Sequence, residues 1–250
     1  MIQPRQLVAH RGYPQCYPEN SLPGIGAAMD AGALWLEWDV QLSADRVPVV
    51  FHDTTLQPGG KQTGDVRELN ANRLSRVQIG QSPDQAPVCI PRLQQAVELL
   101  AGHAEVGVFV EAKTESIDTF GPAVVVDAIL PLLTVLGDRA ILISFDSQIL
   151  KLARDRGHAA IGWVIGSPDI DAQHTARRLQ PDFLFLNRRK LTAAITPLWA
   201  GKWRWVAYTA NTLIQANKLI KRGFDLVETN DIGGMIEAIV RGQNDIDDGT

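Results

Sequence analysis

Short apolar runs alternate with amphipathic segments along the whole chain. Runs rich in branched and aromatic residues predict strands at residues 6–10, 34–40 with 47–53, 105–113, 139–145, 159–166, 182–187, 203–211 and 225–231. The segments between them carry apolar residues at helical spacing, and several end in Gly. They predict helices at residues 21–32, 93–100, 121–133, 147–157, 170–179, 192–200, 212–223 and 232–242. The runs 34–40 and 47–53 count as one unit, so the pattern gives eight strand-then-helix units.

Eight such units predict an α/β protein with a (β/α)8 barrel, the TIM-barrel fold. A doubly wound open sheet is the structural alternative, but the first strand is not followed by the Gly-rich turn of a dinucleotide-binding fold. We expect residues 1–250 to form a single domain. The stretch 54–91, rich in Gly, Gln and Pro, departs from the alternation after the second β unit. It predicts an excursion over the barrel mouth.

Composition adds limits on the class of protein. With 45% hydrophobic residues and a net charge of -4, the chain of 250 residues is typical of soluble globular proteins and lacks a basic face for nucleic acid. The only dense basic run, at residues 188–190, is interpreted as a solvated loop. Cys16 and Cys89 have no metal-ligand spacing and are too few for a disulfide framework. No run approaches the roughly 18 apolar residues of a membrane span, so we expect a cytoplasmic protein.

Polar residues that could take part in a reaction lie where the first predicted strands end. His10 and Arg11 follow the first apolar run, and Glu37 and Asp39 lie two residues apart on the second, so both point to one face. Two neighbouring carboxylates in a barrel repel unless a cation lies between them, and oxygen ligands favour Mg²⁺ or Ca²⁺. Pairing of each carboxylate with a Lys or Arg is the alternative, and the sequence leaves it open.

The next strands add to the same end of the barrel. Glu111 and Lys113 repeat the two-residue spacing, which predicts a third carboxylate for the metal and a cation suited to phosphate. An internal Glu111 to Lys113 ion pair is the plainer alternative. His52 ends the run 47–53, and with His10 it forms a pair that could divide general base and general acid work.

The ordered motifs resemble those of the glycerophosphodiester phosphodiesterase family. In order they are HRG at 10–12, PEN at 18–20, ExD at 37–39, HD at 52–53, IPRL at 90–93, ExK at 111–113, SF at 144–145, an aromatic-Thr-x-Asn at 208–211, and GxDxxxT followed by Asn at 223–230. The set spans nearly the whole chain and is similar to short single-domain cytosolic members from bacteria. Any one motif would be weak, whereas the ordered set is specific.

The resemblance implies a TIM barrel and metal-dependent hydrolysis of a small-molecule glycerophosphodiester to glycerol 3-phosphate and an alcohol. It implies an acid and base pair of histidines, three carboxylate ligands for Mg²⁺ or Ca²⁺ and two cations that hold phosphate. A cyclic phosphate formed by the glycerol 2-hydroxyl is implied as the intermediate. These roles fall on His10 and His52, on Glu37, Asp39 and Glu111, and on Arg11 and Lys113.

Other positions depart from the family pattern or are less defined. We expect Tyr208 and Phe145 to line the substrate pocket, and Glu19 to orient Arg11 or a histidine. The last-strand carboxylate of the family is shifted here to Asp231, and QPGGKQTG at 57–64 replaces the usual residues after HD. A lysophospholipase D-type activity and a barrel that only binds phosphorylated ligands stay as alternatives, and the oligomeric state is open.

Overall fold

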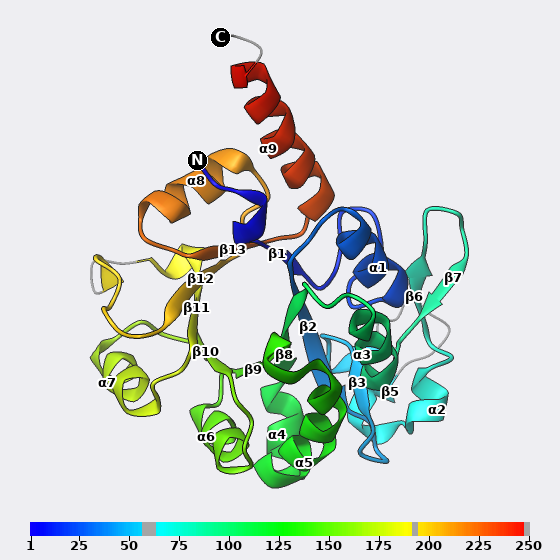
Figure 1. The fold of residues 1–250 in the computed structure, drawn as a ribbon. Coiled ribbons are helices and arrows are strands. Elements are labelled where there is room, and N and C mark those ends of the chain that lie inside the picture. The colour runs from blue at the N-terminus through cyan, green and yellow to red at the C-terminus, as the bar shows by residue number, and fades with distance from the viewer. Residues whose placement is uncertain (57–63, 192–194, 248–250) are drawn as a thin grey trace.

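Eight parallel strands close into a barrel in the computed structural model, which describes residues 1–56, 64–191 and 195–247. Figure 1 looks along this barrel, with the helices arranged around it. Hydrogen bonds join the strands in the order β1, β2, β8, β9, β10, β11, β12 and β13, and β13 pairs back with β1. The strands are β1 (Leu7–His10), β2 (Trp35–Leu42), β8 (Gly107–Ala112), β9 (Ala140–Ser144), β10 (Ile161–Ile165), β11 (Phe183–Asn187), β12 (Arg204–Tyr208) and β13 (Leu226–Thr229). The predicted (β/α)8 barrel is confirmed.

Helices follow the strands along the chain. They are α1 (Leu22–Asp30), α3 (Leu93–Ala101), α4 (Thr114–Phe120), α5 (Pro122–Leu133), α6 (Ser147–Asp155), α7 (Ile170–Leu179), α8 (Leu213–Lys221) and α9 (Ile232–Asp247), with short 3-10 turns η1 (Pro4–Gln6), η3 (Thr134–Arg139) and η4 (Arg188–Lys190). Local chemistry sets their ends: the Ser21 hydroxyl accepts from the backbone N–H of Gly24 and caps α1. No helix in the described ranges is long and apolar enough to cross a membrane.

One predicted helix, at 192–200, is wrong where the structure describes it. Residues 192–194 lie outside the described part, and residues 195–200 form a turn and a loop. Pro197 explains the difference, because it has no N–H for a helix and disfavours helical backbone in the residue before it. Ile195 and Trp199 are nevertheless buried against the core. The apolar spacing of this segment therefore reflects packing onto the barrel and not a helix.

Two apolar layers stabilise the barrel. Side chains that point outward from the strands pack under the helices in a large cluster, and those that point inward fill the barrel in a second cluster. Phe109, Phe183 and Phe185 stack edge to face inside, with ring centroids 4.9 Å apart. The polar residues at the strand ends lie directly above this packed apolar interior.

The predicted excursion is present but lies beside the barrel. β3 (Pro48–Val50) precedes it, and it contains β4 (Thr55–Leu56), β5 (Gly64–Asp65), η2 (Val66–Glu68), α2 (Ala71–Leu74), β6 (Gln78–Gln81) and β7 (Pro87–Cys89). Seven buried residues give it a small core of its own, and Figure 1 shows it next to β2 and β3, outside the ring of strands. Residues 57–63 of the QPGGKQTG segment lie outside the described part.

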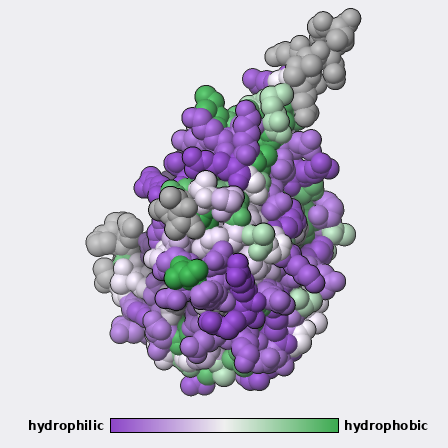
Figure 2. Space-filling model, turned by 90° about the vertical axis from the view of Figure 1, so that its left-hand side faces the viewer, coloured by the Kyte–Doolittle hydropathy of each residue, from purple (hydrophilic) through white to green (hydrophobic). Residues whose placement is uncertain are grey.

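The surface is mostly hydrophilic on the face that Figure 2 shows. Hydrophobic residues there are scattered among polar ones over the described part of the chain. Scattered apolar residues of this kind are ordinary for soluble proteins and do not mark an interface. The polar site at the strand ends is therefore the feature that sets this molecule apart.

Candidate active site

Strand β2 carries the first part of the site because its side chains alternate strictly between two faces. Leu36 and Trp38 point outward into the core under the helices. Glu37 and Asp39 therefore point into the barrel, where both are buried. The predicted shared face of these two carboxylates is observed.

Parallel pairing adds neighbours on both sides of these carboxylates. Glu37 pairs in register with His10 of β1, and Asp39 pairs with Glu111 of β8. Carboxylate oxygens of Glu37, Asp39 and Glu111 all lie within 4.8 Å of one another. Strand register alone thus assembles the predicted acidic cluster at the mouth of the barrel.

The turn after β1 directs Arg11 at this cluster. Arg11 and Asn20 both have left-handed backbone, with φ of 56°. The backbone N–H of Arg11 donates to Glu37 at 3.1 Å, and its side-chain Nε lies 2.9 Å from Asp39 Oδ2. Glu19 binds the other end of the guanidinium at 3.1 Å. Glu19 therefore orients Arg11, one of the two roles that the sequence suggested for it.

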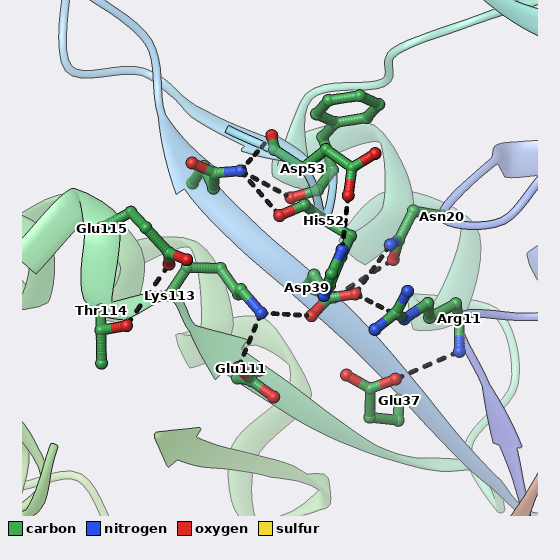
Figure 3. Close-up of polar contacts among 12 residues, drawn as sticks. Arg11, Asn20, Glu37, Asp39, His52, Asp53, Glu111, Lys113, Thr114 and Glu115 are labelled. Atoms are coloured by element: carbon green, nitrogen blue, oxygen red, sulfur yellow. Dashed lines mark hydrogen bonds and ion pairs between the residues drawn. The ribbon is translucent and has the colours of Figure 1, made fainter. Parts of the chain in front are cut away.

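Asn20 holds Asp39 from the other side. Its side-chain Nδ2 donates to Asp39 Oδ2 at 2.9 Å, and its Oδ1 accepts the backbone N–H of Asp39 at 3.1 Å. Asn20 is fully buried, so these bonds form away from water. Figure 3 shows Arg11, Asn20 and Lys113 converging on Asp39.

Lys113 continues the chain from β8 and turns back to the cluster. Its Nζ lies 3.1 Å from Glu111 Oε1 and 3.3 Å from Asp39 Oδ1. The alternative of a Glu111 to Lys113 ion pair is thus observed, together with the acidic cluster that it was set against. Arg11 and Lys113 each pair with only some of the carboxylates, so the ion pairs exist within the acidic cluster and do not replace it.

His52 reaches the site because the chain folds back on itself. β3 runs antiparallel to β2, and the backbone N–H of Phe51 donates to the carbonyl of Asp39 at 3.0 Å. Gln41 fixes the segment by donating from Nε2 to the carbonyl oxygens of residues 51–53 at 2.6–3.3 Å. The strand expected over 47–53 ends at Val50, and this clamp holds the remaining residues in place.

Each of the two histidines uses its Nδ1 to bond a neighbouring side chain, which leaves Nε2 for the pocket. His10 Nδ1 lies 2.8 Å from Asn230 Oδ1, and His52 Nδ1 lies 2.8 Å from Asp53 Oδ1. An amide or carboxylate oxygen accepts, so Nδ1 carries hydrogen in each ring. His10 Nε2 is then left as an acceptor.

A cavity of about 250 Å³ opens between these groups and the opposite wall of the barrel. Polar residues line the side of β1, β2, β8 and β13, and mostly apolar residues line the side of β9 to β12. Tyr208 and Phe145 belong to the second wall, and Phe145 is 39% exposed. The pocket thus has a charged half and an apolar half.

Sequence reasoning missed Glu228 on β13 and Asn230 just after it, and it misplaced Asp231. Glu228 is buried, lines the cavity and has its Oε2 3.8 Å from His10 Nε2. Asn230 bonds His10. Asp231, expected to supply the last-strand carboxylate, accepts instead from the backbone N–H of Gly234 and from Tyr13, so it begins α9. A carboxylate within the short strand LVET was the signal that could have revealed Glu228.

Burial and mutual repulsion govern the protonation of the carboxylates. They raise the pKa of Glu37, of Glu228 and, to about 7, of Glu111. Burial opposes ionisation of Asp39 as well, but Arg11 and Lys113 hold the pKa of Asp39 below its usual value. Burial and the charge of Arg11 lower the pKa of His10 to about 4. The site therefore has more buried carboxylates than its two cations can neutralise.

This charge balance fits a bound divalent cation. Within the described part of the chain, four acidic side chains and two basic ones meet at the barrel mouth: Glu37, Asp39, Glu111 and Glu228, with Arg11 and Lys113. Glu37, Asp39 and Glu111 offer oxygen atoms only, a donor set that suits Mg²⁺ or Ca²⁺. These three residues are the candidate ligands.

Fold and site together define a (β/α)8-barrel enzyme with its active site at the carboxyl ends of the strands. A family model described as "Glycerophosphoryl diester phosphodiesterase family" matches residues 10–234. The chain therefore belongs to the glycerophosphoryl diester phosphodiesterase family.

Curated relatives agree with this assignment. A glycerophosphodiester phosphodiesterase of Caldanaerobacter subterraneus is 25% identical over 244 residues, which span 94% of this chain and 98% of the relative. One from Bacillus altitudinis is 31% identical over 110 residues, 43% of this chain and 45% of the relative. The human glycerophosphodiester phosphodiesterase 1 is 31% identical over 113 residues, which cover 41% of this chain and 33% of the relative.

Solved structures share the fold. An Oleispira antarctica phosphodiesterase in complex with the product sn-glycerol-3-phosphate matches with a TM-score of 0.81 and 24% identity, covering 94% of this chain and 96% of that one. A glycerophosphodiester phosphodiesterase of Thermotoga maritima matches with a TM-score of 0.72 and 22% identity, covering 93% and 97%. At these identities the likeness supports the barrel alone.

Proposed function

We propose that this chain is a glycerophosphodiester phosphodiesterase that releases glycerol 3-phosphate and an alcohol. The observation that carries the proposal is the placement of two histidines and two cations around one buried acidic cluster, in a chain of this family. The relative from Oleispira antarctica holds sn-glycerol-3-phosphate, a product of the size that the cavity suits.

Arg11 and Lys113 would bind the nonbridging oxygens of the phosphate. Both line the cavity, and the carboxylates around them raise the pKa of each, so both stay charged. Charge-assisted hydrogen bonds from fixed cations strengthen as negative charge builds on the phosphorus oxygens. A divalent cation held by Glu37, Asp39 and Glu111 would add Lewis-acid stabilisation of the same charge.

His10 would act as the base and His52 as the acid in the first step. His10 Nε2 can accept the proton of the glycerol 2-hydroxyl, whose oxygen attacks phosphorus as the bond to the alcohol breaks. His52, with Asp53 behind its Nδ1, can give its Nε2 proton to the departing alcohol oxygen. The intramolecular attack yields a cyclic phosphate and lowers the entropic part of the barrier. In the second step the roles reverse, and water opens the ring.

A substrate panel tests this function. Purified protein with Mg²⁺ or Ca²⁺ is assayed on glycerophosphocholine, glycerophosphoethanolamine and lysophosphatidylcholine. Glycerol 3-phosphate release is measured enzymatically for the first two and choline release for the lysolipid, and phosphorus NMR is used to detect the cyclic phosphate. We expect turnover of the first two and a transient cyclic species. Turnover of the lysolipid alone would indicate a lysophospholipase D-type enzyme. Tight binding of glycerol 3-phosphate without turnover of any diester would indicate a binding-only barrel.

A further inference from the structure

Glu228 is a buried carboxylate that the proposed chemistry leaves unused. It stands on β13, directly beside Val8 of β1 in the strand register, and only 2% of its surface is exposed. Neighbouring inward residues of the same strand layer are apolar and belong to the barrel interior. A carboxylate in such a position costs free energy unless hydrogen bonds satisfy its oxygens.

The protein supplies little of what Glu228 needs. Its Oε1 has no hydrogen-bond partner within the described part of the chain. Its Oε2 lies 3.8 Å from His10 Nε2, beyond hydrogen-bond distance. Glu228 also stands apart from the group of Glu37, Asp39 and Glu111, whose oxygens lie within 4.8 Å of one another. Glu228 lines the cavity, so an occupant of the cavity can supply a donor to this carboxylate.

Charge decides which part of an occupant can meet Glu228. A phosphate is drawn to Arg11 and Lys113, on the side of β1 and β8. Glu228 lies instead where the charged half of the cavity meets the wall formed by Phe185 and Tyr208. A neutral organic group with hydroxyl donors suits this border, because its carbon atoms can contact the aromatic wall and its hydroxyls can donate to the carboxylate.

We propose that Glu228 accepts hydrogen bonds from the glycerol hydroxyls and so makes the site specific for hydroxyl-bearing phosphate esters. This inference rests on the proposed function and names the residue that selects the glycerol side of the substrate. A site built to bond a hydroxyl discriminates strongly against an analogue that lacks it, because the buried acceptor is then left unpaired. Removal of Glu228 should therefore abolish a preference and leave phosphate binding in place.

Two ligands with the same phosphate isolate this effect. Calorimetry with Mg²⁺ present measures the Kd of sn-glycerol 3-phosphate and of propyl phosphate, which lacks both hydroxyls, for wild type, Glu228→Gln and Glu228→Met. The ratio of the two Kd values cancels any change in charge around the phosphate. We expect propyl phosphate to bind wild type at least about ten-fold more weakly than glycerol 3-phosphate. The ratio should fall to about one in Glu228→Met and lie between these values in Glu228→Gln, which keeps an acceptor oxygen.

Three results would overturn the inference. A wild-type ratio near one would show that the hydroxyls are not recognised. An unchanged ratio in Glu228→Met, with propyl phosphate still bound, would place their recognition elsewhere. A KM for glycerophosphocholine that rises in Glu228→Met, with both Kd values unchanged, would assign Glu228 to the cationic alcohol group. Because glycerophosphocholine turnover by wild type is measured separately, failure of this inference is distinguished from failure of the proposed function.

Discussion

Replacing Asn20 with Ala tests whether the loop after β1 holds the acidic cluster in place. The substitution removes the donor to Asp39 Oδ2 and leaves the backbone N–H of Asp39 without its acceptor. Loss of a hydrogen bond to a charged group costs about 1.5–3 kcal/mol, and an orphaned buried N–H about 1–3 kcal/mol. Left-handed backbone at φ 56° adds about 1–2 kcal/mol for a residue with a Cβ that cannot bond locally.

Because these contributions share Asp39, we expect the free energy of unfolding to fall by about 3–5 kcal/mol. Urea-induced unfolding followed by circular dichroism measures it. Asn20→Gly loses the same hydrogen bonds, but glycine adopts the left-handed backbone without steric strain. This variant should therefore be about 1 kcal/mol more stable than Asn20→Ala. Asn70→Ala is the matched control: Asn70 caps α2 at the surface through the N–H of Arg73, and its loss should cost about 1 kcal/mol. If Asn20→Ala costs no more than Asn70→Ala, the clamp on Asp39 is not a stabilising feature.

Three further outcomes follow from the site. His52→Ala should lose about 10²–10⁴-fold in kcat on glycerophosphocholine but far less on a glycerol diester of p-nitrophenol, whose leaving group needs no proton from an acid. His10→Ala should lose a similar factor on both substrates. Equal losses for the two variants on the p-nitrophenol diester would contradict the division of roles. Mg²⁺ affinity should weaken as the pH falls from about 8 to about 6, because Glu111, whose pKa is raised to about 7, must release its proton to bind the ion. Calorimetry in buffers of different ionisation enthalpy measures this proton release. A Kd for Mg²⁺ that does not change with pH would refute the expectation. Lys113→Met should lower kcat/KM about ten-fold or more, with a fall in kcat because the lysine contact strengthens as charge builds on the phosphate, unlike Lys151→Met on the exposed face of α6. Equal effects of the two substitutions would contradict a role of Lys113 in phosphate binding.

Local pattern was enough to predict the barrel and the residues on its first strands. The spacing of Glu37 and Asp39 fixes a shared face without any knowledge of neighbours, because a strand has a period of two. The helix expected at 192–200 was wrong over 195–200, the residues that the structure describes, because apolar spacing does not distinguish a helix from an irregular segment packed on the core.

Glu228 could not be placed by spacing, since it lies far along the chain from His10. Only closure of the barrel, which pairs β13 with β1, brings the two within 3.8 Å. The sequence motif pointed to Asp231 as the carboxylate of the last strand. Strand β13 ends at Thr229, however, and the side chain of Asp231 accepts from the backbone N–H of Gly234 at the start of α9. Long-range register and local capping both depend on tertiary structure, which single-sequence patterns do not contain.

Release of glycerol 3-phosphate from glycerophosphocholine tests the central claim most directly. The assay compares wild type with His52→Ala in Mg²⁺, in Ca²⁺ and in EDTA, with a thermal melt of each protein to establish folding. The account predicts turnover by wild type with at least one of the two cations, none in EDTA, and a loss of about 10²-fold or more in the folded variant. Turnover that persists in EDTA or in folded His52→Ala would contradict it, as would no turnover by wild type with either ion.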